Sequence, residues 1–381
     1  MTRPNISRTG LVLSGGGARA AYQVGVLKAI SEILPFTTHQ NPFPIISGTS
    51  AGAINATVVA AYAQHFRLGM KRLENVWANF HCDQIFLTNF WTLTRSSASW
   101  IKTLIGGTSK GPIGLLDNQP LAKLLDSVIP YPLIEKAIAQ GELEALTVTA
   151  SSYTTGESIS FYQATSQTQP WRRHRRRGHP AIISTSHLLA SAAIPMVFPV
   201  TKVGSQYFGD GSMRFLAPLS PALHLGADKI LVVGVDPAHA PVDELSHPEG
   251  YPTIAEIGGH VLDSVFIDSL ESDLERLQRI NSTLNKIPDR IKAKSFHLKN
   301  IETLVINPSQ DISLIAREHF SALPRAVQFF LRRIGIDGQS GDSILSYLLF
   351  EKPFTRALIQ LGYQDASNKA DDILAFYGLP T

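Results

Sequence analysis

Short apolar runs alternate with glycine-rich turns over the first sixty residues of the chain. Apolar residues at 9–14 and at 43–47 form compact runs that lead into glycine, a pattern typical of short buried strands. After each run, apolar residues recur at helical spacing, first to about Leu34 and then to about Tyr62. A strand, a glycine-rich turn and a helix, repeated twice, predict a parallel sheet whose loops gather at one edge.

The middle of the chain adds elements that extend this sheet. Residues 146–153 and 158–162 alternate in polarity around the turn at 154–157, which predicts a β-hairpin. A helical pattern follows at 184–191, and the apolar run at 229–235 predicts another buried strand.

Beyond residue 241 the pattern becomes mostly helical. One strand candidate lies at 303–307, and helices are predicted at 253–285, 313–334, 343–361 and 370–377. We therefore expect a three-layer α/β/α fold with a mainly parallel central sheet. Residues 8–240 are predicted to form one domain, and residues 241–381 a mostly helical C-terminal extension packed on it.

Two segments carry a pattern of their own. Residues 84–116 mix aromatic side chains with Thr, Ser and Gly, which favours a helix pair packed on the sheet, with a lid or a lipid-facing apolar surface as the alternative. Arg172–Arg177 is the dense charge run of the chain. Such runs are mostly solvated loops. The main competing interpretation is peripheral contact with an anionic membrane surface, and nucleic-acid binding is disfavoured because no aromatic platform accompanies the run.

Composition and charge narrow the functional classes. The 381 residues are 44% hydrophobic and 17% charged, and a net charge of +3 does not by itself indicate a nucleic-acid partner. The single cysteine, Cys82, excludes an internal disulfide framework. The N-terminal residues lack an apolar signal region, and no apolar run is long enough to cross a membrane. We expect a cytoplasmic protein that can act peripherally at the membrane.

The second strand–helix turn has the layout of a nucleophile elbow. Gly48–Gly52 reads Gly-Thr-Ser-Ala-Gly, with glycines two residues before and two after Ser50. Glycines at these positions let the backbone cross close to itself and leave the serine hydroxyl exposed at the tip. Alone, this motif is also an ordinary strand-to-helix turn, so its interpretation depends on the rest of the chain.

The first turn supplies candidate hydrogen-bond donors. Three consecutive glycines, Gly15, Gly16 and Gly17, leave their backbone N–H groups unobstructed, as an oxyanion hole requires. The same residues also satisfy a dinucleotide-binding fingerprint. That fingerprint requires an acidic residue about 20 positions later, and residues 36–42 contain none. Dinucleotide binding is therefore disfavoured.

A serine nucleophile also requires a base. Asp210 stands between glycines in a predicted tight turn, which makes it the candidate. A Ser-His-Asp hydrolase is the competing interpretation, and the twelve histidines cannot exclude it by number. In such hydrolases, however, the elbow usually follows several strands, whereas Ser50 follows one earlier strand.

These motifs together resemble the patatin-like phospholipase family. The resemblance rests on Gly15–Arg19, Gly48–Gly52, the Ser-Ala-x-x-Pro-x-x-Phe-Pro block at Ser191–Pro199, and Asp210-Gly211, and it extends over about residues 8–235. Ala20 and Ser212 depart from the family pattern, which usually has Gly at the first position and Gly or Ala at the second.

The resemblance implies hydrolysis of lipid acyl esters, of the phospholipase A or lysophospholipase type, within a catalytic domain at 8–240. Ser50 would be the nucleophile and Asp210 the base, and neither a metal nor a cofactor is implied. The amides of Gly15, Gly16 and Gly17 would form the oxyanion hole, and Arg19 would help to hold that loop. Two alternatives remain: a catalytically silent membrane-associated binding or scaffolding protein, and a hydrolase of water-soluble esters.

Overall fold

The computed structural model describes residues 8–38, 40–87, 114–237, 253–288, 299–333, 335–336 and 341–380. Within these ranges the strands form one ten-stranded sheet. The strands are β1 (Thr9–Leu13), β2 (Ile45–Thr49), β3 (Ala145–Ser152), β4 (Ser158–Ala164), β5 (Arg172–Arg173), β6 (Arg176–Pro180), β7 (Thr201–Val203), β8 (Gln206–Asp210), β9 (Lys229–Val233) and β10 (Glu302–Ile306).

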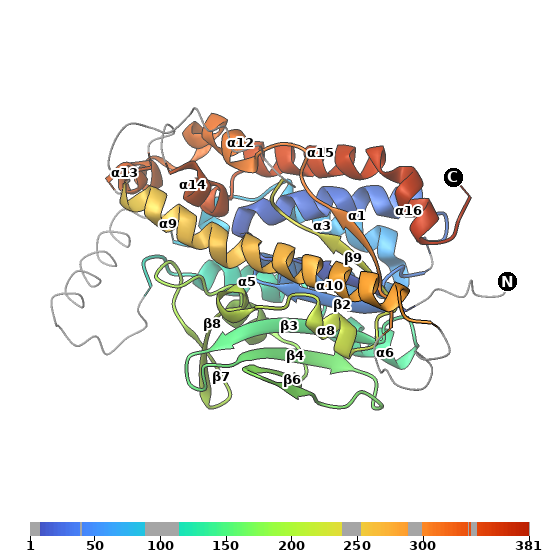
Figure 1. The fold of residues 1–381 in the computed structure, drawn as a ribbon. Helices are drawn as coiled ribbons and strands as arrows, with labels where there is room; N and C mark the ends of the chain where they lie inside the picture. Colours follow the sequence, from blue (N-terminus) through green and yellow to red (C-terminus); the bar gives the residue numbers. More distant parts are fainter. Residues whose placement is uncertain are drawn as a thin grey trace.

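The centre of the sheet is parallel. Its order is β10-β9-β1-β2-β3-β4-β6-β5, and the first five of these strands run in the same direction. The β3–β4 hairpin is antiparallel, and β8 pairs antiparallel with the end of β3. The predicted mainly parallel sheet and the predicted hairpin are confirmed. The carboxyl ends of β1, β2 and β3 therefore lie at one edge, where Figure 1 also shows the start of α1.

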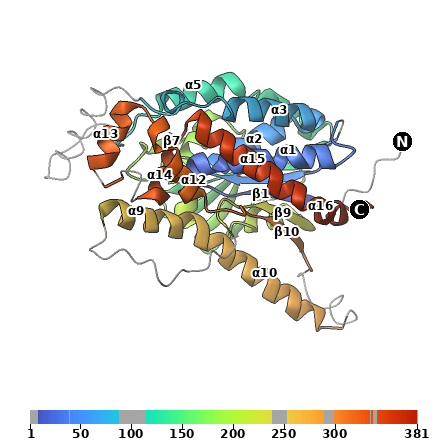
Figure 2. The same ribbon diagram turned by 90° about the horizontal axis from the view of Figure 1, so that it is seen from above.

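Helices cover both faces of the sheet, as the view in Figure 2 shows. One face carries α1 (Ala21–Ile33), α2 (Ala51–Ala61), α3 (Phe66–Trp77) and α15 (Lys352–Asn368). The opposite face is covered by α8 (Ser220–His224) and α10 (Ser269–Asn285). This arrangement is the predicted three-layer α/β/α fold. The other α-helices among the described residues are α5 (Gln119–Val128), α6 (Pro132–Ala139), α7 (Thr185–Ser191), α9 (Ile254–Asp263), α12 (Ile312–Glu318), α13 (Arg325–Arg333), α14 (Asp342–Leu348) and α16 (Ala370–Phe376).

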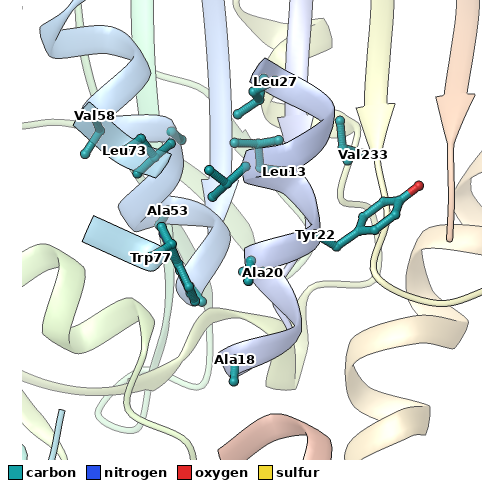
Figure 3. Close-up of a cluster of buried hydrophobic side chains, with 14 of the residues drawn as sticks. Leu13, Ala18, Ala20, Tyr22, Leu27, Ala53, Val58, Leu73, Trp77 and Val233 are labelled. Atoms are coloured by element: carbon teal, nitrogen blue, oxygen red, sulfur yellow. The ribbon is translucent and has the colours of Figure 1, made fainter. Parts of the chain in front are cut away.

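The larger core lies between the sheet and the helices α1, α2 and α3. Figure 3 shows Ala53, Val58, Leu73 and Trp77 on the α2–α3 side of α1. The Trp77 indole donates a hydrogen bond of 2.8 Å to Asn55 Oδ1, and the Asn55 amide donates to the Ala20 carbonyl at 3.1 Å. These bonds satisfy polar groups that would otherwise be costly to bury. They also fix α3 against the start of α1, close to the edge where the glycine-rich turns lie.

The residues beyond 300 contribute to the same layers. β10 extends the parallel part of the sheet beside β9, in agreement with the strand predicted at 303–307. α15 packs along α1 so closely that a Cβ on Gly25 would lie 2.0 Å from the Ile359 carbonyl oxygen. The helices predicted at 313–334 and 343–361 are each broken in two. In the first, α13 begins directly after Pro324, and in the second, α15 begins at Lys352 with Pro353 in its first turn.

Other elements differ from the sequence prediction. Arg172–Arg177 is not a loop but contributes to an edge hairpin of β5 and β6, although residues 172–175 are solvent-exposed as predicted. Asp210 ends the strand β8 and is followed by the short 3₁₀ helix η4 (Gly211–Arg214), where a tight turn was predicted. The predicted helix pair at 84–116 falls mostly on residues 88–113, which lie outside the described residues.

Candidate active site

Ser50 occupies a strained position between β2 and α2. Its φ of 54° and ψ of −131° lie in a region that residues with a side chain rarely adopt. A Cβ on Gly48 would lie 2.5 Å from the Gly52 carbonyl oxygen, and a Cβ on Gly52 would lie 2.3 Å from the Ser14 carbonyl oxygen. Both positions therefore require glycine, and the turn has the geometry of the predicted nucleophile elbow.

Ser191 secures this elbow. The Ser50 amide donates a hydrogen bond of 2.8 Å to Ser191 Oγ, and the Ser191 hydroxyl donates one of 2.6 Å to the Thr149 carbonyl. The Ser191 hydroxyl thus links the end of β3 to the strained residue. Sequence analysis included Ser191 in a recognised block without assigning it this role, because the contact joins positions 141 residues apart.

Gly15, Gly16 and Gly17 follow β1 at the same edge of the sheet. Gly17 begins the 3₁₀ helix η1 (Gly17–Ala20) with a φ of +54°, and a Cβ there would lie 2.3 Å from the Tyr347 carbonyl oxygen. Within the part of the chain that the structure describes, the amides of these three glycines donate to no protein acceptor. A turn with free N–H groups beside a serine hydroxyl can stabilise negative charge.

Asp210 is fully buried, and the register places it opposite Ala150 at the end of β3. Its Oδ1 accepts a hydrogen bond of 2.9 Å from the Ser212 amide. Its Oδ2 has no partner of regular hydrogen-bond geometry among the described residues. The Ser50 hydroxyl is nevertheless close enough to act on the Asp210 carboxyl group. The serine and the aspartate, 160 positions apart in sequence, are therefore neighbours in the fold.

The protonation state of Asp210 reflects this burial. Burial raises the pKa of Asp210 from its ordinary value of 3.8 to about 7, and hydrogen bonds from Ser50 and Ser212 offset part of that rise. A carboxyl group with a pKa near neutrality can both accept and return a proton. Among the described residues, no histidine side chain hydrogen-bonds to Ser50 or Asp210.

Arg19 is buried among partners that lie far along the chain. Its side chain is 1% exposed, and its guanidinium donates to Ser346 Oγ at 2.7 Å and pairs with Asp236 and Asp263 at 3.3 and 3.4 Å. It also stacks on Tyr347, with Cζ 4.2 Å from the ring centroid. These contacts engage both ends of the guanidinium. Its contacts hold η1, directly after the glycine run, against residues far along the chain.

An apolar cavity that is partly open to solvent has Ser50 and Gly17 in its lining. Along α2 it is lined at helical spacing by Ala51, Ile54, Val58 and Tyr62, so it follows the helix for about 18 Å from Ser50. Helices α3 and α5 supply the opposite walls. Their lining residues are Arg72, Leu73, Val76 and Trp77, and Leu121, Leu124, Leu125 and Val128. Its almost entirely apolar lining suits an apolar group that reaches Ser50.

The single cysteine is poorly suited to act as a nucleophile. Cys82 is buried, and burial, followed by the nearby Glu351 carboxylate, raises the pKa of its thiol well above the ordinary value.

None of the helices within the described ranges is long and apolar enough to span a bilayer.

Residues 11–223 match the family of patatin-like phospholipases. The chain is 26% identical over 219 residues to a cGAMP-activated phospholipase of Pseudomonas aeruginosa, which covers 56% of this chain and 55% of that protein. It is also 44% identical over 63 residues to triacylglycerol lipase 4 of Saccharomyces cerevisiae, covering 16% of this chain and 6% of that protein. The chain thus spans about half the length of the bacterial relative.

Solved structures were also compared with the fold. Human GIVD cytosolic phospholipase A2, in complex with methyl gamma-linolenyl fluorophosphonate, has a TM-score of 0.41 and 11% identity, and the match covers 98% of this chain and 59% of that chain. VipD from Legionella pneumophila has a TM-score of 0.35 and 12% identity, and the match covers 96% of this chain and 67% of that chain.

Proposed function

The chain belongs to the patatin-like phospholipase family, and from this premise we propose that it hydrolyses acyl ester bonds of lipids, with Ser50 as nucleophile and Asp210 as general base. One observation carries the proposal: the strained serine adjoins both a buried carboxyl group and the end of a long apolar cavity. The carboxyl group supplies the base, and the cavity accommodates the acyl chain. The base and the proposed acyl-chain site thus both adjoin the Ser50 hydroxyl.

The first half of the reaction forms an acyl-enzyme. Ser50 Oγ attacks the ester carbonyl carbon while Asp210 accepts the hydroxyl proton. The carbonyl oxygen becomes an oxyanion, which the amides of Gly15, Gly16 and Gly17 stabilise through hydrogen bonds. When the tetrahedral intermediate collapses, the bond to the alcohol oxygen breaks, and the alcohol leaves with the proton from Asp210. The acyl group remains on Ser50 with its chain in the cavity.

The second half regenerates the enzyme. A water molecule attacks the acyl carbon, and Asp210 accepts one of its protons. The oxyanion forms again at the glycine turn. Collapse breaks the bond to Ser50 Oγ, which takes back the proton from Asp210, and the free fatty acid is released. In this cycle Asp210 alternates between base and acid, as a pKa close to neutrality permits.

Covalent labelling tests the proposal directly. A long-chain fluorophosphonate should modify Ser50 of the wild-type protein, as located by peptide mass spectrometry, because an activated serine attacks the phosphorus. Ser50→Ala should remove the label, and Cys82→Ala, which lies outside the site, should retain it.

The result also separates the alternatives. A folded wild-type protein that takes no label on Ser50 and hydrolyses no lipid ester would contradict the proposal and favour a binding or scaffolding protein. Hydrolysis of butyryl but not palmitoyl esters would instead assign the site to water-soluble esters.

A further inference from the structure

Three turns that are far apart in sequence meet at the catalytic edge of the sheet. The β3–β4 turn is linked to the β5–β6 turn, because the Ser158 amide donates to the Arg175 carbonyl at 2.9 Å. It is linked to β8 by a bond of 2.9 Å from the Tyr153 amide to the Tyr207 carbonyl. Figure 1 shows the β3–β4 turn and the β7–β8 hairpin on the same side of the molecule as the start of α1.

These linked turns carry exposed side chains, which we group under the name edge surface. The Arg214 guanidinium donates to the Gly156 carbonyl at 3.3 Å, and Lys202 lies opposite Tyr207 in the β7–β8 register. The edge surface comprises Tyr153, Arg173, Arg175, Lys202, Tyr207, Arg214 and Leu216. From β7 to β6 it spans four strand spacings, or about 19 Å.

The edge surface carries unpaired positive charge. Arg172 and Arg177, at the ends of the arginine run, pair with Glu157 at 3.2 and 3.6 Å. Within the described ranges, Arg173, Arg175, Lys202 and Arg214 pair with no carboxylate. The edge surface therefore has a net positive field that can attract a negatively charged partner.

Large apolar and aromatic side chains accompany these cations. Tyr153 is 49% exposed, Tyr207 50% and Leu216 72%. Tyrosines are enriched at membrane interfaces, where the ring lies at the level of the lipid head groups and the hydroxyl stays in water. Cations beside exposed aromatic and aliphatic groups fit an anionic bilayer better than they fit nucleic acid, which requires planar stacking platforms along a groove.

The edge surface also adjoins the catalytic residues. Tyr153 lies over Gly209, the neighbour of Asp210, so closely that a Cβ on Gly209 would be 2.6 Å from the tyrosine hydroxyl. A bilayer in contact with this surface would therefore present its lipids beside the residues proposed for hydrolysis.

We propose that the edge surface docks the protein on anionic membranes and thereby brings lipid to Ser50. The purpose of this docking rests on the proposed lipid hydrolysis, but vesicle binding can be measured without any hydrolysis. Arg173, Arg175, Lys202 and Arg214 are attracted to the anionic head groups, while Tyr153, Tyr207 and Leu216 enter the interfacial region.

Vesicle flotation of the full chain tests this proposal. We expect the wild-type protein to bind vesicles that contain phosphatidylglycerol and to bind pure phosphatidylcholine vesicles much more weakly. In a triple variant, Arg173→Glu, Arg175→Glu and Lys202→Glu, partition to the anionic vesicles should fall by roughly 100-fold, since each basic residue contributes about 1 kcal/mol at such a surface. High salt should weaken wild-type binding.

A matched control separates the surface from overall charge. Lys123→Glu, Lys136→Glu and Arg279→Glu change the net charge by the same amount at exposed positions on α5, α6 and α10, outside the edge surface. This variant should retain most of the vesicle binding. Equal losses in the two triple variants, or wild-type binding to single-stranded DNA and not to anionic vesicles, would overturn the proposal.

Failure of docking and failure of hydrolysis give different results. The edge variant should still react with a fluorophosphonate and hydrolyse a soluble butyryl ester at the wild-type rate, because its three substitutions lie outside the catalytic residues. Unlabelled Ser50 with intact vesicle binding would contradict the proposed function and leave the docking surface standing.

Discussion

The proposed mechanism requires Asp210 to ionise at a fully buried position, where a charge is unfavourable. A carboxyl group without solvent contact loses hydration when it ionises, which is why its pKa rises to about 7. The Ser212 amide, which donates to Oδ1, and the nearby Ser50 hydroxyl offset only part of this rise. The raised pKa makes the ionised carboxylate a stronger base, and the same burial lowers the free energy of unfolding when the group is ionised.

Asp210→Asn should remove activity and raise stability at the same time. Loss of the general base should lower kcat by roughly 10³-fold. The folded-state pKa is raised, so ionised Asp210 lowers the free energy of unfolding as pH increases from 3.8 through about 7, by an amount on the order of 4 kcal/mol. On the alkaline side of this range the variant should melt at a higher temperature than the wild-type protein.

The pH profile of the wild-type protein supplies the control. Because the base must be ionised, kcat/KM should rise about tenfold per pH unit below the pKa and level off above about pH 7. An Asp210→Asn variant that kept this profile and near-normal turnover would contradict the assignment of Asp210 as the base.

At the residue scale, local motifs were predictable and their surroundings were not. The glycines of the elbow follow from steric requirements within a few residues, and the sequence pattern identifies them. The Ser191 hydroxyl that holds the Ser50 amide is supplied by α7, a separate element. Which hydroxyl reaches that amide depends on packing across 141 residues, and no spacing rule contains this information.

At the scale of elements, the apolar cavity results from three helices that share a lining pattern. α2, α3 and α5 each present apolar residues three or four positions apart, which place one side chain per turn on the cavity wall. The sequence predicts α2 as a helix, but it does not distinguish a face that borders a cavity from a face that is tightly packed. That distinction depends on how far apart the three helices lie.

If the proposed hydrolysis occurs at Ser50, the lining of this cavity predicts how the rate depends on acyl chain length. Val58 lies two turns along α2, about 12 Å from Ser50, and lines the cavity. Val58→Trp should obstruct the cavity beyond this point, so that palmitoyl esters lose at least about tenfold in kcat/KM while butyryl esters are unaffected. Rates measured on a series of acyl chain lengths would reveal the shift.

Val58→Ala is the matched control for this prediction. It enlarges the same position and should retain hydrolysis of palmitoyl esters, although the lost packing lowers the melting temperature. If a folded Val58→Trp protein lost butyryl and palmitoyl hydrolysis equally, the chain would not occupy this cavity.

At the scale of the whole molecule, residues from both ends of the chain meet at Arg19. Its partners Asp236, Asp263, Ser343 and Ser346 follow it by more than 200 positions, and Gly17 contacts the backbone of Tyr347. The family resemblance implies that Arg19 holds the glycine turn, but the resemblance ends near residue 235, before all four of these partners. Long-range contacts of this kind are set by the assembled layers, so the sequence predicts the loop without predicting what supports it.

Asp263 provides a test of whether this support matters for catalysis. Its carboxylate pairs with Arg19 and accepts hydrogen bonds from Ser343 Oγ at 2.7 Å and from the Tyr347 hydroxyl at 2.9 Å. Asp263→Asn removes one of the two carboxylate charges that pair with Arg19, and we expect this to loosen the turn at Gly17. A small displacement of oxyanion donors is costly, so kcat should fall by about 10- to 100-fold, with KM nearly unchanged because the acyl cavity is intact.

The matched variants make this prediction specific to the network. Asp263→Glu retains the charge and should recover part of the lost kcat, whereas Asp371→Asn, at an exposed position of α16, should behave as wild type. An increase in KM without a change in kcat would instead indicate that Asp263 acts on substrate binding. A lower melting temperature with both constants unchanged would assign Arg19 and its partners to folding alone, because the glycine turn would then hold its donors in place without them.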